Sequence, residues 1–169
     1  MAKSRTTNAR ARTVRRSQVE MTQLVLPNDT NQLGNLLGGR LMEWMDIAAA
    51  VSAQRHSSRV CVTAGVDDLV FHQPIRLSEV VTLRASVNRA FGTSMEVGVH
   101  VTSENQLTGH RKTANTAYLT FVAVDEALLP VKVPPIVPST GVEKRRFREA
   151  LERRALRLEN RKGRRARLR

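Results

Sequence analysis

One carboxylate lies in the middle of an apolar stretch of the chain. Asp46 sits within residues 41–53, LMEWMDIAAAVSA, where Glu43 and Ser52 are the other polar side chains. Such a carboxylate loses solvation, so it needs polar partners or takes a raised pKa, and either condition makes it a candidate acid or base. A structural carboxylate paired with a backbone donor or an arginine is an equally good interpretation. Glu43 is expected to be a solvated or capping carboxylate near the start of a helix.

A segment rich in glycine precedes this stretch. Gly38 and Gly39 end the run LGNLLGG, residues 33–39. Glycines at the start of a helix let a ligand approach free backbone N–H groups, which together with the helix dipole can stabilise an oxyanion. This is chemistry for attack on a carbonyl, although relief of crowding would also explain a glycine pair. Asn35 follows Gly34, and this order on its own is typical of a turn.

Asp46 and Asn35 are too far apart in the sequence to meet on one substrate atom within one chain. Asp46 follows Gly39 by seven residues, which is roughly 10 Å along a helix, whereas Asn35 precedes the helix. A two-fold dimer would bring the loop of one subunit against the helix of the other. The spacing therefore points to a site shared between two subunits.

The sequence lacks the patterns of several other chemistries. Its histidines, His56, His72, His100 and His110, show no metal-ligand spacing. No GxSxG elbow, P-loop or dinucleotide-binding glycine fingerprint occurs. We therefore expect neither a metal ion nor a dinucleotide cofactor.

Hydrophobic periodicity predicts the elements that position these residues. Gly39–His56 is the expected helix, apolar nearly all round and therefore buried on most sides. Runs rich in Val, Thr, Leu and aromatic residues predict strands at Thr22–Leu26, Val60–Val66, Asp68–Phe71, Val80–Val87, Met95–Val101 and Thr116–Val124. One buried helix and these consecutive strands predict an α+β fold, in which a curved antiparallel sheet is wrapped around one long central helix.

The positive charge lies at the two ends of the chain. Residues 1–20 carry a net +5 and residues 141–169 a net +9, against −1 for residues 21–140. We expect a disordered basic arm over residues 1–18, the domain over 19–140, and an Arg-rich amphipathic helix and tail over 141–169. Nucleic acid is a conceivable partner of the tails. One Trp and one Tyr offer few stacking platforms, however, so solvated tails are favoured.

Composition also favours a cytoplasmic location. The single cysteine, Cys61, cannot form an internal disulfide, which suits a reducing compartment. No apolar run is long enough for a membrane span. Residues 1–19 have the composition of a mitochondrial transit peptide but no apolar helical face, so that interpretation is less favoured.

Several motifs in order resemble one family. The run from Leu26 to Ile75 resembles the hotdog-fold acyl-CoA thioesterases of the acyl-CoA hydrolase type, found in bacteria and, in tandem, in animals. Phe91–Glu104 and Ala114–Glu126 resemble the same family, so the similarity covers nearly all of residues 22–140. The resemblance implies the hotdog fold, a homodimer with a continuous sheet, and further assembly into a trimer of dimers.

The resemblance also implies roles for individual residues. Asn35 and Asp46, from opposite subunits, would be the catalytic pair, with Asp46 as general base or nucleophile and the Gly39 N–H polarising the carbonyl. The substrate would be an acyl-CoA thioester, and no separate cofactor is needed because coenzyme A is part of it. Further substrate contacts are expected at Gly38, Arg40, Thr63, Phe71, His72, Thr93 and Ser94.

Two other functions remain open on the sequence. A hotdog enoyl-CoA hydratase or dehydratase would need a histidine beside a carboxylate, and His56 ends the helix far from Asp46. An acyl-CoA-sensing module would use the basic tails to hold nucleic acid. Acyl chain length cannot be predicted, because tunnel depth depends on packing that periodicity does not specify.

Overall fold

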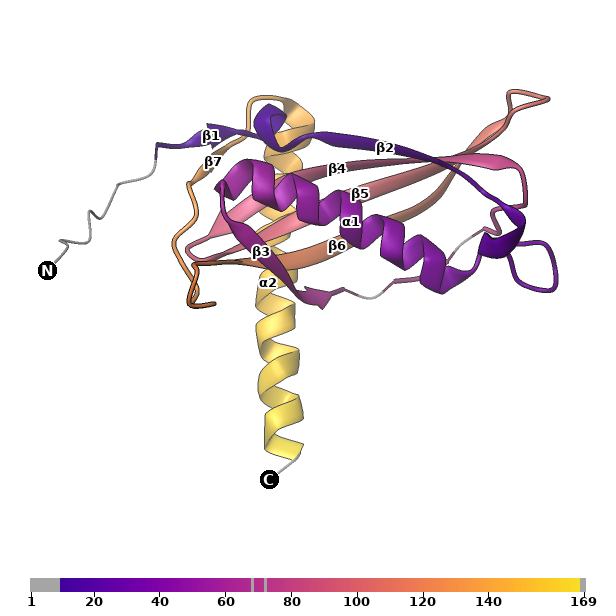
Figure 1. Ribbon diagram of the computed structural model, residues 1–169. Helices are drawn as coiled ribbons and strands as arrows, with labels where there is room; N and C mark the ends of the chain where they lie inside the picture. The colour runs from indigo at the N-terminus through magenta and orange to yellow at the C-terminus, as the bar shows by residue number, and fades with distance from the viewer. Residues whose placement is uncertain (1–9, 68, 72, 168–169) are drawn as a thin grey trace, which may run out of the picture.

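A five-stranded antiparallel sheet curves around a single long helix, α1 (Figure 1). The structure is a computed structural model that describes residues 10–67, 69–71 and 73–167. The sheet has the order β2-β4-β5-β6-β3, and α1 spans Gly38–Ser57. The strands are β2 (Val19–Leu24), β3 (Val60–Val66), β4 (Glu79–Phe91), β5 (Ser94–Asn105) and β6 (Arg111–Val124). The predicted α+β fold, with the sheet wrapped around one helix, is confirmed.

The core lies between α1 and the concave face of the sheet. Alternating residues of β5, from Met95 to Val101, are fully buried there, as the period-two pattern predicts. From the helix, Leu41, Met45, Ala48 and Ala49 complete this core. The alanines of α1 keep the helix close to the sheet, because a small side chain leaves little space to fill.

One face of α1 departs from the prediction of burial on most sides. Met42, Ile47 and Val51 are 43%, 46% and 37% exposed. Beside them, β3 pairs with β6 on one side alone and is an edge of the sheet, and its Val60 and Val62 are also exposed. An apolar helix face next to an unpaired strand edge is typical of a surface that another protein chain covers.

A second helix, α2 (Gly141–Arg167), crosses the sheet on the face opposite α1 and extends past the β3 edge (Figure 1). Phe147 and Ala150 pack toward the domain, and the predicted C-terminal helix is confirmed. The side chains of its residues 164–167 are not described. Among the described residues, no helix is both long and apolar enough to cross a membrane.

The N-terminal segment differs from the expected disordered arm over residues 1–18. Arg12–Thr13 form β1, which pairs in parallel with β7 (Ile136–Val137), and Val14–Ser17 form the short helix η1. Val14 is 5% exposed, and the Arg12 guanidinium donates to the carbonyl of His56. These partners are distant in sequence, so composition could not reveal them. Residues 1–9 lie outside the described residues.

Strand boundaries differ from the predictions at several places. β4 ends at Phe91 and β5 at Asn105, each four residues beyond the predicted end, and β6 begins at Arg111, five residues before the predicted start. β2 begins at Val19, three residues before the predicted start, and ends at Leu24. The predicted strand Asp68–Phe71 is absent from the described residues 69–71, where the Val70 carbonyl accepts from the Asn115 side chain at 2.8 Å. Asp68 itself lies outside the described residues. A short helix, η2 (Pro27–Asp29), follows β2.

Candidate functional site

Asp46 is half-buried on α1 and is bonded to one side chain of the sheet. Thr63 of β3 donates its hydroxyl to Asp46 Oδ1, with an oxygen-to-oxygen distance of 2.7 Å. Because the bond uses one carboxylate oxygen, Oδ2 remains available to accept a proton or a hydrogen bond. Of the two interpretations of Asp46, this arrangement favours a working carboxylate, since no arginine or backbone donor of the described residues neutralises it.

The Asp46–Thr63 pair borders an apolar cavity of about 360 Å³. Its walls come from the first turns of α1, from β3 and from β6: Gly39, Met42, Glu43, Met45, Asp46, Thr63, Val66, Leu69 and Leu119. The lining combines the carboxylates of Glu43 and Asp46 and the hydroxyl of Thr63 with mostly apolar side chains, which suits a ligand that is apolar along most of its length and polar at one end.

The start of α1 faces this cavity with free backbone donors. The helix begins at Gly38, its N-cap residue is Leu37, and no described side chain caps it. A methyl group on Gly39 would meet nothing within 4 Å, so a ligand atom can reach the backbone there. At Gly38 the Phe71 ring already lies 3.3 Å from the position of a Cβ, so this glycine is required for close packing.

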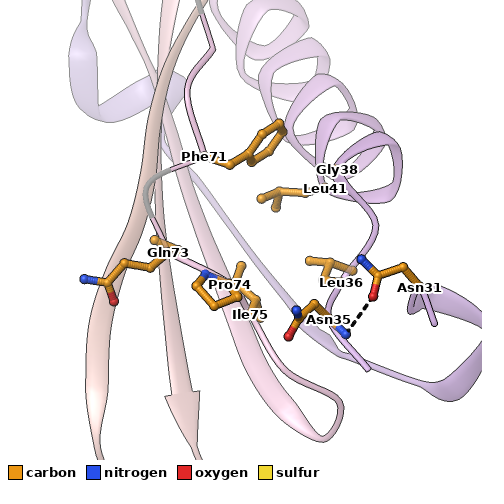
Figure 2. A pocket seen from close by; sticks show the side chains of 10 residues that line it. Asn31, Asn35, Leu36, Gly38, Leu41, Phe71, Gln73, Pro74 and Ile75 are labelled. Carbon is orange, nitrogen blue, oxygen red and sulfur yellow. Dashed lines mark hydrogen bonds between the residues drawn. The ribbon is translucent and has the colours of Figure 1, made fainter. Parts of the chain in front are cut away.

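A second cavity of about 340 Å³ lies on the other side of the helix start (Figure 2). It is lined by Asn31, Asn35, Leu36, Gly38, Leu41, Phe71, Gln73, Pro74, Ile75 and Ala114. Asn35 and Asp46 thus border different cavities of one subunit. The structure brings Asn35 together with Gly38 and Phe71, and brings Asp46 together with Gly39 and Thr63.

Asn31 is a lining residue that the sequence analysis did not single out. Its side-chain oxygen accepts from the backbone N–H of Leu33 at 2.9 Å and of Asn35 at 3.2 Å, so its NH₂ group is the part it can offer to a ligand (Figure 2). In the sequence, Asn31 stands in the run NDTNQLG, where asparagine is typical of a turn. That turn role is real, and it fixes the side chain at the rim of the cavity.

The other predicted contacts lie outside these two cavities. Arg40 pairs with Asp29 at 3.0 Å and with Glu43 at 2.7 Å. Thr93 lies in the turn between β4 and β5, and Ser94 is the first residue of β5, where its hydroxyl accepts from Arg154 of α2 at 3.2 Å. His72 lies outside the described residues. No group of three or more His, Cys, Asp or Glu side chains within the described ranges is placed to hold a metal ion.

Comparison with known proteins identifies relatives over most of the chain. A family model described as "Thioesterase superfamily" matches residues 33–110. The chain is 44% identical over 142 residues to mouse acyl-coenzyme A thioesterase 11. The aligned region covers 84% of this chain and 24% of the mouse protein. It is also 44% identical over 127 residues to an uncharacterized acyl-CoA thioester hydrolase of Bacillus subtilis, covering 75% of this chain and 74% of the relative.

Solved structures agree with this similarity. A hexameric acyl-CoA thioesterase, crystallised in its apo form, is 40% identical, with a TM-score of 0.86, covering 93% of this chain and 98% of the other. An acyl-CoA hydrolase of Staphylococcus aureus, solved with butyryl coenzyme A and coenzyme A, is 33% identical with a TM-score of 0.82, covering 92% and 93%. The chain spans between 24% and 38% of the length of the mouse and rat relatives that it matches.

Proposed function

We propose, from the premise that this chain belongs to the thioesterase superfamily, that it hydrolyses acyl-CoA thioesters to free acid and coenzyme A. The observation that carries this proposal is the Thr63–Asp46 hydrogen bond in an apolar cavity beside the uncapped start of α1. A thioester has the matching shape, with an apolar acyl chain and one polar carbonyl. Water is the only other reactant, so the proposed reaction uses no cofactor.

Asp46 would act as the general base. Thr63 holds Oδ1, so Oδ2 can take a proton from a water molecule as its oxygen attacks the thioester carbon. The Gly39 N–H at the start of α1 would stabilise the negative charge that forms on the carbonyl oxygen. The carbon–sulfur bond then breaks, and the proton held by Asp46 can pass to the leaving thiolate. Direct attack by Asp46 on the carbonyl is the alternative within the same site.

The second polar group of the site would come from a partner subunit. The exposed apolar residues of α1 and the free edge of β3 provide a surface on which a second copy can extend the sheet. Pairing there would set the loop of one subunit, with Asn31 and Asn35, against the helix of the other. We propose a homodimer as the catalytic unit and a trimer of dimers as the larger assembly, in the cytoplasm.

Two asparagines compete for this role, and residue spacing favours Asn31. Alanine variants of an asparagine, an aspartate and a threonine of the Staphylococcus aureus acyl-CoA hydrolase have been solved, and these residues are spaced by 15 and 17 positions. Asn31, Asp46 and Thr63 have the same spacings here. Asn35, the predicted partner, lies four residues closer to Asp46. We therefore propose that Asn31, and not Asn35, positions the substrate or the water molecule.

The geometry gives the hydratase alternative little support. That reaction needs a histidine beside a carboxylate, but His56 is 0% exposed and its Nε2 lies 2.8 Å from the carbonyl of Pro134. Among the described residues, no histidine lines the cavity that holds Asp46. The other alternative, an acyl-CoA-sensing module that binds nucleic acid, rests on the basic tails and not on this cavity.

A thiol-release assay across acyl-CoA chain lengths tests the proposal. Wild-type protein should release CoA, and Asp46→Asn should reduce kcat by about 10²- to 10⁴-fold, the usual contribution of a general base. Asn31→Ala should lose activity in the same assay, whereas Asn35→Ala should lose less. Turnover of an enoyl-CoA without release of free CoA would reject hydrolysis in favour of hydration, and full activity of Asp46→Asn would reject the assignment of the base.

A further inference from the structure

A buried carboxylate anchors α2 to the outer face of the sheet. Glu96 of β5 is 0% exposed, and Arg153 of α2 donates to its two oxygens at distances of 2.6 to 3.2 Å. Asn88 of β4 donates to Glu96 Oε1 at 3.1 Å, and Arg153 stacks 3.6 Å above the ring of Tyr118. Because two buried charges are stable only when they are paired, these contacts fix the position of α2 relative to β4, β5 and β6.

A second arginine of α2 connects Glu96 to the residue that follows β3. Arg157, one turn beyond Arg153, donates to Glu96 Oε2 at 3.1 Å and to Asp67 Oδ2 at 2.6 Å. The Asp67 side chain is 19% exposed, and its backbone N–H donates to the Tyr118 carbonyl at 3.0 Å. Burial raises the pKa of Asp67, and the charge and hydrogen bond of Arg157 oppose this effect.

Asp67 is the first residue of the connection from β3 to β4, and residues of this connection line both cavities. It directly follows Val66, which together with Leu69 lines the cavity of Asp46. Further along the same connection, Phe71 packs against the helix start at Gly38 and lines the cavity of the asparagines. The connection from β3 to β4 thus forms one side of each cavity, and Asp67 is the residue from which it leaves the sheet.

Tertiary contacts hold the first part of this connection in place. Its described residues 69–71 form no strand or helix. Side chains of β6 hold its middle, since Asn115 donates to the Val70 carbonyl and Lys112 to the Pro74 carbonyl, both at 2.8 Å. Backbone bonds to the loop before α1 hold its end, where the Leu36 N–H donates to the Ile75 carbonyl at 2.7 Å and the Leu77 N–H to the Gly34 carbonyl at 3.0 Å. At the other end, where the connection leaves β3, the Arg157–Asp67 pair is the attachment that α2 supplies.

We propose that α2 shapes the substrate cavity from the opposite face of the sheet, and that the Arg157–Asp67 ion pair is the link. Arg157 and Asp67 are positioning residues: they hold the connection from β3 to β4, and with it Leu69 and Phe71, against the start of α1. The expected change in KM rests on the proposed function, whereas the expected change in the position of the connection does not. The acidic and basic partners lie 90 residues apart in the chain.

Steady-state kinetics of full-length variants test the link. Asp67→Asn and Arg157→Gln should each raise KM for acyl-CoA by roughly three- to tenfold with a smaller change in kcat, because the cavity wall moves while Asp46 and Thr63 keep their contact. Arg157→Lys keeps the charge but not the two-pronged geometry, so it should restore part of the loss. Arg145→Gln is the matched control, since Arg145 lies on the same helix, 61% exposed.

Amide hydrogen exchange separates this inference from the proposed function. In Asp67→Asn and Arg157→Gln, peptides that cover residues 67–75 should exchange faster than in wild type and in Arg145→Gln, whatever the protein hydrolyses. Faster exchange in a protein that hydrolyses no acyl-CoA would refute the function and keep the link. Wild-type KM together with unchanged exchange in both variants would refute the link and leave the function standing.

Discussion

Thr63 determines how Asp46 can act. Its hydroxyl holds one carboxylate oxygen at 2.7 Å and so leaves the other available to accept a proton. Thr63→Val removes the hydroxyl and keeps the branched shape, and we expect kcat to fall roughly tenfold, the effect of one hydrogen bond to a charged group. Thiol release at saturating acyl-CoA measures this change. An unchanged kcat would show that Thr63 does not orient the base.

His56 is the residue whose protonation should weaken the fold. Burial lowers the pKa of His56 below its usual value of 6.5, and Arg12 and Arg16 add to this, although the bond to Pro134 opposes it. Its Nδ1 is buried with no hydrogen-bond partner among the described residues, so a proton there would be unpaired. The neutral form is therefore the one the fold accepts.

The sign of the pH effect follows from that preference. As the pH falls below about 6.5, the unfolded chain takes up a proton at His56 before the folded protein does, so the free energy of unfolding decreases. Above that pH the contribution is fully present. Urea unfolding between about pH 8 and about pH 5 should show this loss, and His56→Gln should reduce its slope. An equal slope in both proteins would place the acid sensitivity elsewhere.

Some residues of the site could be predicted from the sequence, and others could not. Asp46 and the glycine pair stood out because an acid in an apolar run and two glycines at a helix start are locally unusual. Asn31 did not, because asparagine after Asp-Thr is ordinary in a turn and its second role depends on a cavity formed by Phe71 and Gln73–Ile75. The partners Arg157 and Asp67 are too distant in sequence for spacing to reveal them.

At the scale of elements, the start of α1 is the part that packing controls most tightly. A Cβ on Gly38 would lie 3.3 Å from two atoms of the Phe71 ring, closer than most real contacts. Gly38→Ala should therefore displace Phe71 and reduce kcat/KM several-fold. Gly141→Ala is the matched control, because Gly141 is also the first residue of a helix and a Cβ there meets nothing within 4 Å.

Comparing these two glycine variants separates geometry from helix propensity. Both replacements favour helix formation, so they should change the stability in the same direction unless the Phe71 contact opposes it. Thermal unfolding and thiol release of the two proteins measure this. Equal kcat/KM in Gly38→Ala and wild type would show that the ring can move without effect on the site.

The elements themselves were predicted to different degrees. α1 and the strands β3 to β6 form where the sequence predicts a helix and strands, because their residue types favour these elements over many residues. β1 and η1 were missed, since Val14 is buried by contacts that no local period encodes. The predicted strand Asp68–Phe71 had suitable residue types, yet its described residues serve as a wall between cavities.

At the scale of the whole molecule, one subunit distributes the candidate residues over two separate cavities. Asp46 and Thr63 border one cavity, and Asn31 and Asn35 border the other. The free β3 edge and the exposed apolar residues of α1 provide the surface through which two such chains can complete each other. The spacing of Asn35 and Asp46 predicts a dimer, because the two residues lie too far apart to meet within one chain, and this dimer stays a prediction.

Mixing two inactive variants tests the shared site most directly. Asp46→Asn and Asn31→Ala proteins are unfolded together, refolded together and assayed for thiol release beside each variant refolded alone. A site built from two subunits predicts recovery of up to about a quarter of wild-type activity, because half of the random dimers are mixed and each holds one intact site. No recovery, with mixed dimers demonstrated in the sample, would contradict a site shared between subunits.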